Sequence, residues 1–109
     1  MGVSIPEGAT IMLHHRTVED VLSGAKRMAE SLHQRLVGRR VHAVLGFECG
    51  ARTRPFLGDE ATLQENLMLQ NRIAPDAEWI GGMFWGELFP AANGPAFHNY
   101  SYPLLVIAE

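Results

Sequence analysis

The sequence predicts an α+β fold: a two-layer sandwich with a four-stranded mixed sheet and two helices on one of its faces, in the order β-α-β-α-β-β. Two observations support this prediction. One amphipathic helix has clear start and stop signals, and strand-like segments lie on both sides of it. The chain has 109 residues, of which 47% are hydrophobic and 19% are charged. This length and composition indicate a single domain over residues 1–109 that can bury a core.

The first predicted helix follows a short strand expected over residues 9–14. Thr17 with Asp20 three residues later forms a capping-box pattern, and Gly38 is a typical C-terminal stop. Between them the apolar residues recur at steps of three and four, which places them on one helical face. These residues are Val18, Val21, Leu22, Ala25, Met28, Ala29, Leu32 and Leu36.

The next two elements are a buried strand and a second helix. Residues 41–48 alternate so that Leu45 and Phe47 share one strand face with Cys49. Asp59 is a candidate N-cap for the second helix, which ends before Pro75. The residues expected to line that helix are Leu63, Leu67, Ile73 and either Leu69 or Gln70.

Two further strands are predicted, over residues 78–88 and 99–108. Glycines at 81, 82 and 86 interrupt the first, which indicates a bulge, strong curvature or a close approach by another group. Pro103 lies within the second and favours an edge strand or a bulge, because proline cannot donate to a ladder. The sheet face away from the helices then needs cover, and we expect a partner domain or an identical subunit to supply it.

Composition and charge exclude several classes of function. The net charge of −3 and the pI near 5.9 give no electrostatic footprint for nucleic acid. A single cysteine excludes an internal disulfide framework, and no histidine spacing resembles a zinc site. The N-terminus shows no signal-peptide pattern, and the apolar run at 104–108 is too short to span a bilayer. We therefore expect a soluble, cytoplasmic protein without a membrane partner.

Glu87 and His98 form the sharpest candidate pair. A loop around Asn93 joins their segments, so a hairpin would bring the carboxylate near the imidazole. In that register Trp85 faces Tyr100 and Met83 faces Tyr102, which would form an aromatic shelf with a polar end. The alternative is a structural hydrogen bond with aromatic residues that only fill the core.

The chain resembles the C-terminal domain of the FIST family, a sensory module of bacterial signal transduction. Three motifs carry the resemblance: Gly46–Arg52 (GFECGAR), Gly86–Pro90 (GELFP) and Phe97–Ser101 (FHNYS). They are similar to the family's Cys-x-x-Arg, Gly-Glu-Ile and His-Asn-x-Thr segments. Leu88 and Ser101 are mild departures, whereas the N-terminal FIST domain that normally precedes this one is missing from the sequence.

The resemblance implies a small ligand, with amino acids among the family's proposed ligands. It also implies a signalling partner or an N-terminal FIST domain as the protein partner. Some members are reported to bind haem, for which His98 would be the candidate ligand here. No cofactor follows from the residues themselves.

The remaining candidate residues each have two interpretations. Cys49 is either a reactive thiol or a small core residue. Arg52 either clamps a ligand carboxylate or forms an ion pair. Asn99 either orients the ligand or holds the turn.

We therefore expect a sensory domain, without catalytic residues, that binds an amino-acid-like molecule or a small carboxylate. The expected ligand-binding residues are Cys49, Arg52, Trp85, Glu87, His98, Asn99 and Tyr100. A homo-oligomer is expected. Two alternatives remain open: an interaction module without a pocket, and an enzyme with a Glu87–His98 acid–base pair.

Overall fold

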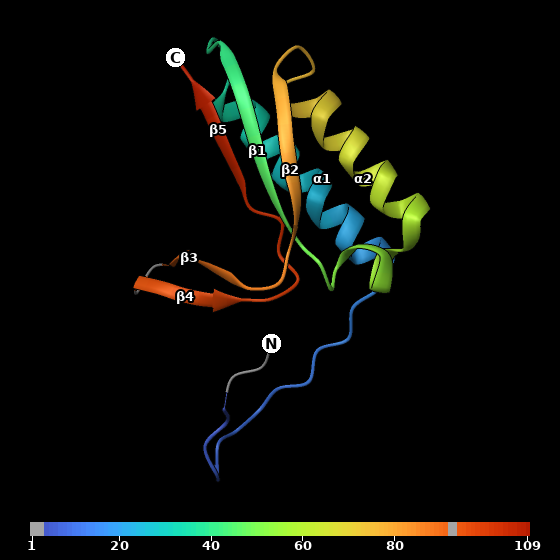
Figure 1. The fold of residues 1–109 in the computed structure, drawn as a ribbon, viewed down its shortest axis with the longest axis vertical. Helices are drawn as coiled ribbons and strands as arrows, with labels where there is room; N and C mark the ends of the chain where they lie inside the picture. The colour runs from blue at the N-terminus through green and yellow to red at the C-terminus, as the bar shows by residue number, and fades with distance from the viewer. Residues whose placement is uncertain (1–3, 92–93) are drawn as a thin grey trace.

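A computed structural model describes residues 4–91 and 94–109. Two helices, α1 (Val18–Arg35) and α2 (Gly58–Ile73), lie side by side on one face of a three-stranded sheet (Figure 1). The strands are β1 (Val41–Cys49), β2 (Glu78–Phe84) and β5 (Leu104–Ala108). A separate hairpin, β3 (Glu87–Ala91) with β4 (Gly94–His98), projects below the sheet in this view. The α+β class and the helix layer are confirmed, but the single four-stranded sheet is wrong.

Strand β1 is the centre of the sheet, because β2 pairs with it in parallel and β5 pairs with it antiparallel. Val44 of β1 is fully buried under the helices, where Ala29, Leu69 and Ile73 complete the core. Partly buried residues from all three strands pack around this core, among them Val41, Trp79, Leu104 and Val106. The side chains of Leu45 and Phe47 occupy the opposite face of the same strand, as the alternation predicts.

Helix α1 forms as its sequence predicts. The Thr17 side chain accepts a hydrogen bond from the backbone N–H of Asp20, and the Asp20 carboxylate accepts one from the backbone N–H of Thr17. Gly38 takes a φ of 77°, which a residue with a side chain rarely adopts. The capping box therefore fixes where α1 begins, and the glycine turns the chain toward β1.

Helix α2 begins differently from the prediction. A π-helical turn over Thr53–Leu57 precedes it, and no side chain caps its first turn, so the expected Asp59 cap is wrong. The buried residues are Glu65, Leu69 and Ile73, whereas Leu63 and Leu67 are exposed. The helix is rotated so that a carboxylate, rather than those leucines, faces the sheet.

The C-terminal half contains four strands where two were predicted. Gly86, with a φ of 140°, separates β2 from β3, and residues 99–103 separate β4 from β5. Pro103 immediately precedes β5, which is an edge strand as the proline indicated. Asn93, in the predicted hairpin loop, lies outside the described residues.

The segment before α1 is not a strand. Residues 4–16, called the arm below, form no ladder with any described strand, so the strand predicted over residues 9–14 is wrong. The arm extends away from the sheet and the helices (Figure 1). Neither of the two described helices combines the length and apolarity needed to cross a membrane.

Candidate functional site

Glu87 is a buried carboxylate at the first position of β3. Only 6% of its surface is exposed, and its Oε2 accepts hydrogen bonds from the backbone N–H and the hydroxyl of Ser101. The backbone N–H of Ser101 lies 3.0 Å from Oε2. Both hydrogen bonds involve Oε2, so Ser101 does not contact the second carboxylate oxygen, Oε1, through a hydrogen bond.

His98 is the cross-strand partner of Glu87, so the predicted hairpin pairing is confirmed. The imidazole stacks on Phe89, with ring centroids 3.5 Å apart and an interplanar angle of 9°. Within the described residues, Glu87 Oε1 and His98 Nε2 are both buried and both lack a hydrogen-bond partner. Because buried polar atoms are rarely left unsatisfied, two such atoms on paired residues indicate a place for a ligand or a water molecule.

The surroundings of the Glu87 carboxyl group favour its ionised form. Burial alone would raise its pKa, but the Cys49 thiol and the two Ser101 donors favour the carboxylate and outweigh burial. The pKa of Glu87 is therefore lowered, with a smaller contribution from the nearby His98. At neutral pH the group is therefore an anion, with Oε1 buried next to the Cys49 thiol.

This lowered pKa predicts a pH-dependent contribution to stability. A carboxyl group whose pKa is lower in the folded state stabilises the fold above its unfolded pKa, near 4.5, and loses that effect as the pH falls through the folded value. The stability advantage of the wild type over Glu87→Gln should be constant from neutral pH down to about pH 5 and then shrink. Urea unfolding between pH 7 and pH 3.5 measures this difference. The exposed Glu78→Gln is the control, and an advantage that grows below pH 4.5 would contradict the assignment.

Glu87 is also among the residues that line a groove of about 530 Å³ between the end of the three-stranded sheet and the hairpin. Its walls are mainly apolar, and Glu87 is the only charged residue among those described as lining it. The lining residues are Phe47, Phe84, Gly86, Glu87, Leu88, Phe89, Pro90, Pro103, Leu104 and Leu105. An apolar hollow with one placed polar group is the usual character of a small-molecule site.

Cys49 lies at the end of β1 with its thiol next to Glu87. The residue is only 3% exposed, which agrees with its interpretation as a small packed residue. A thiol is a weak hydrogen-bond donor, so its proximity leaves Glu87 Oε1 as an acceptor for a stronger donor.

Arg52 lies on the helix side of the sheet and not at the groove. Its guanidinium forms a bidentate ion pair with the fully buried Glu65 and donates a further hydrogen bond, 3.0 Å long, to Glu48. Burial raises the pKa of Glu48, and the second carboxylate adds to that effect, although Arg52 opposes it. These contacts satisfy the guanidinium internally and give no support to a ligand clamp.

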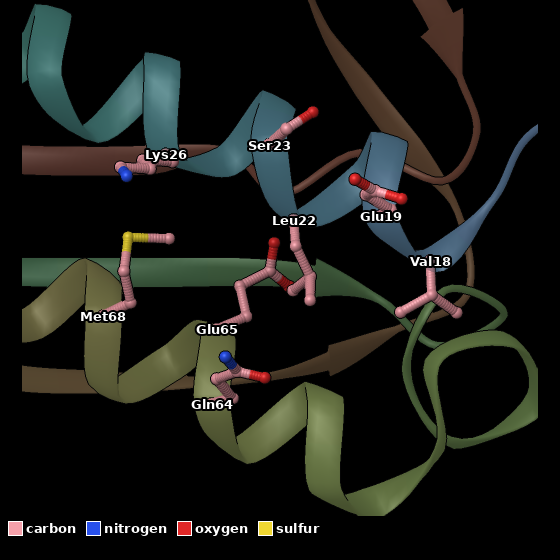
Figure 2. A pocket seen from close by; sticks show the side chains of 8 residues that line it. All are labelled: Val18, Glu19, Leu22, Ser23, Lys26, Gln64, Glu65 and Met68. Atoms are coloured by element: carbon pink, nitrogen blue, oxygen red, sulfur yellow. The ribbon is translucent and has the colours of Figure 1, made fainter.

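A second hollow, also of about 530 Å³, lies between α1 and α2 (Figure 2). Glu65 extends from α2 toward α1 beside Leu22, and Val18 and Met68 contribute apolar side chains. The Glu65 carboxylate is already paired with Arg52, so this hollow offers no comparable open acceptor from that residue.

Trp85 and Tyr100 do not form the predicted aromatic shelf. The β3–β4 ladder ends at Glu87 and His98, and Met83 instead pairs with Glu48 of β1. Trp85 is largely exposed, with its ring against Gly50. Tyr100, with a φ of 59°, turns the chain away and lies under the guanidinium of Arg16 at 3.7 Å. The predicted pairing of Trp85 with Tyr100 and of Met83 with Tyr102 is therefore wrong.

Asn99, also expected at the site, is exposed just after β4.

Several residues of the groove are not among the ligand-binding residues that the sequence predicts. Phe84 lies in the strand predicted over residues 78–88, and Phe89 and Ser101 are positions of the motifs only. Phe89 lies two residues after Glu87, so strand alternation places both side chains on the same face of the strand. This alternation is the one signal in the sequence that links Phe89 to Glu87.

The described residues offer no grouping of three or more histidine, cysteine or carboxylate side chains suited to a metal ion. For haem, the ligating atom would be His98 Nε2. That atom is buried beside the Phe89 ring, and His98 does not line the groove. The described lining of the groove therefore provides no histidine ligand for a haem.

A family model for the FIST C domain matches residues 1–90. The matched range contains two of the three motifs, Gly46–Arg52 and Gly86–Pro90, and ends before His98. The comparisons with curated proteins and with solved structures gave no match.

Proposed function

Because the chain belongs to the FIST C domain family, a family of sensory domains in signal transduction, we propose that it senses a small amino-acid-like molecule in the groove beside Glu87. The observation that carries this proposal is the buried, unpartnered Oε1 of Glu87. A protonated amine is the natural partner for such an acceptor, since it supplies three donors and a positive charge.

The apolar groove supports a ligand with an apolar side chain. Phe47, Phe84 and Phe89 line it, and burial of apolar ligand surface against them would supply most of the affinity. The groove lining contains neither lysine nor arginine among the described residues. An amine-bearing ligand is therefore favoured over a simple carboxylate, which was the other candidate from the sequence.

The test compares three related probes: phenylalanine, phenethylamine and 3-phenylpropionate. The two amines should raise the melting temperature in a saturating manner, and 3-phenylpropionate should not. Glu87→Gln should weaken binding of the amines roughly 10- to 100-fold, because a charge-assisted hydrogen bond is lost. Isothermal titration calorimetry measures the affinities.

Glu78→Gln is the matched control, since this exposed carboxylate lies on β2 outside the groove. Binding of 3-phenylpropionate alone, or amine binding that Glu87→Gln leaves unchanged, would contradict the proposal. Haem belongs in the same panel. A haem spectrum that His98→Ala abolishes, without any amine effect, would also contradict it.

A further inference from the structure

One face of the three-stranded sheet is apolar and is not covered by the described chain. The register places Leu45 beside Ile80 on one side and beside Leu105 on the other, and pairs Cys49 with Phe84. Ile80 is 70% exposed. Six large apolar residues lie on this side of the sheet, and we call them together the uncovered face: Leu45, Phe47, Ile80, Phe84, Leu105 and Ile107.

The edge of this sheet at β5 is equally unprotected. The five residues of β5 are LLVIA, and its outer edge has no strand partner among the described residues. Natural edge strands normally carry a charge, a proline or a bulge that prevents association. Pro103 precedes β5 and the pairing of β5 with β1 is irregular at Val41–Ala43, but the five residues of β5 themselves include no charge and no proline.

The arm also exposes apolar side chains, which could pack on the apolar uncovered face. Ile11, Met12 and Leu13 are all exposed, Leu13 to 94%. The base of the arm is fixed, because the Arg16 guanidinium lies over the rings of Tyr100 and Phe56 at 3.7 and 5.0 Å. Beyond this anchor the arm points away from its own sheet (Figure 1), so its apolar side chains have no cover within the chain.

The exposed area of the chain is larger than that of a compact monomer of the same mass. The chain exposes 8030 Å², whereas a compact monomer of 12.1 kDa exposes about 6,000 Å². The radius of gyration is 15.5 Å, against about 13 Å for a compact domain of this length. A stable interface needs roughly 800 Å² from each partner, and the exposed area of the chain exceeds that of a compact monomer by about 2,000 Å².

We propose that the uncovered face is the interface between two copies of this chain, and that the arm of each copy packs on the uncovered face of the other. One chain supplies both the apolar segment and the apolar surface, so a second copy satisfies both at once in a symmetric exchange. Phe47, Phe84 and Leu105 of this face also line the groove at Glu87, so the interface adjoins that site, but the proposal requires no ligand there.

The test measures the mass of the whole chain in solution by sedimentation equilibrium across micromolar concentrations. The wild type should sediment at twice the 12.1 kDa of one chain. Ile80→Lys on the uncovered face and Leu13→Asp on the arm should each weaken dimerisation roughly tenfold or more. Both side chains are exposed in the single chain, so neither substitution disturbs its core.

Leu63→Lys is the matched control, because this leucine is 61% exposed on α2, away from the sheet. It should leave the dimer unchanged. A monomeric wild type would overturn the proposal, as would a dimer that tolerates either Ile80→Lys or Leu13→Asp. A mixed disulfide between a Leu13→Cys chain and an Ile80→Cys chain would directly support the exchange.

Discussion

Arg52→Met should destabilise the protein by about 3–5 kcal/mol, because it leaves two buried carboxylates without their counter-charge. Glu65 is fully buried and Glu48 is 5% exposed, and both are bound to the same guanidinium. Tyr102 adds to this buried polar cluster: its hydroxyl lies 2.6 Å from Asn66 Oδ1, and burial raises its pKa to about 12. Urea unfolding at pH 7 measures the loss.

The control for this variant is Arg54→Met, two residues further along the chain. Arg54 forms an exposed ion pair with Asp59, so its loss should cost at most about 1 kcal/mol. The triple variant Arg52→Met, Glu48→Gln and Glu65→Gln removes the uncompensated charge and should recover much of the stability. An Arg52→Met loss no larger than that of Arg54→Met would show that the ion cluster does not stabilise the fold.

Gly81→Ala should be the second most damaging of the substitutions considered, at about 2–3 kcal/mol. Gly46 of β1 pairs with Gly81 of β2, and a Cβ at position 81 would lie 2.5 Å from the carbonyl oxygen of Gly46. Backbone atoms cannot move aside as a flexible side chain can, so the two strands must separate at the middle of the sheet. Thermal and urea unfolding measure the effect.

Gly82→Ala is the neighbouring control. A Cβ at position 82 would meet only the Phe84 ring, at 3.6 Å, which is ordinary van der Waals contact. This variant should stay within about 0.5 kcal/mol of the wild type. Equal stabilities of the two alanine variants would contradict the close approach of β1 and β2. The predicted close approach at the glycines of this strand thus has a specific partner, which sequence alone could not name.

Part of the candidate site could be predicted because it depends on local pairing. Glu87 and His98 flank a short loop, and a hairpin across it places them opposite each other. The pairing ends at these two residues, because Gly86 and Tyr100 adopt positive φ values that turn both strands. The expected contacts of Trp85 and Tyr100 were therefore wrong, although the pairing from which they were extrapolated was right.

The partners of Arg52 show the opposite case. Glu65 lies 13 residues away on α2, and the rotation of that helix decides whether it meets solvent or the sheet. The spacing of the apolar residues predicts Leu63 and Leu67 on the inner side, whereas the helix buries Glu65 in line with Leu69. An ion pair between distant elements cannot be inferred from the period of the apolar residues alone.

The sequence by itself determined the features that rest on local interactions. These are the α+β class, the start of α1 at its capping box, the alternation of β1 and the family to which the chain belongs. Tertiary structure alone decided the separation of the hairpin from the sheet, the burial of Glu65 with Arg52 and the groove beside Glu87. The physical reason is that caps and strand periodicity involve residues a few positions apart. Strand order, helix rotation and burial depend instead on which distant surfaces pack together.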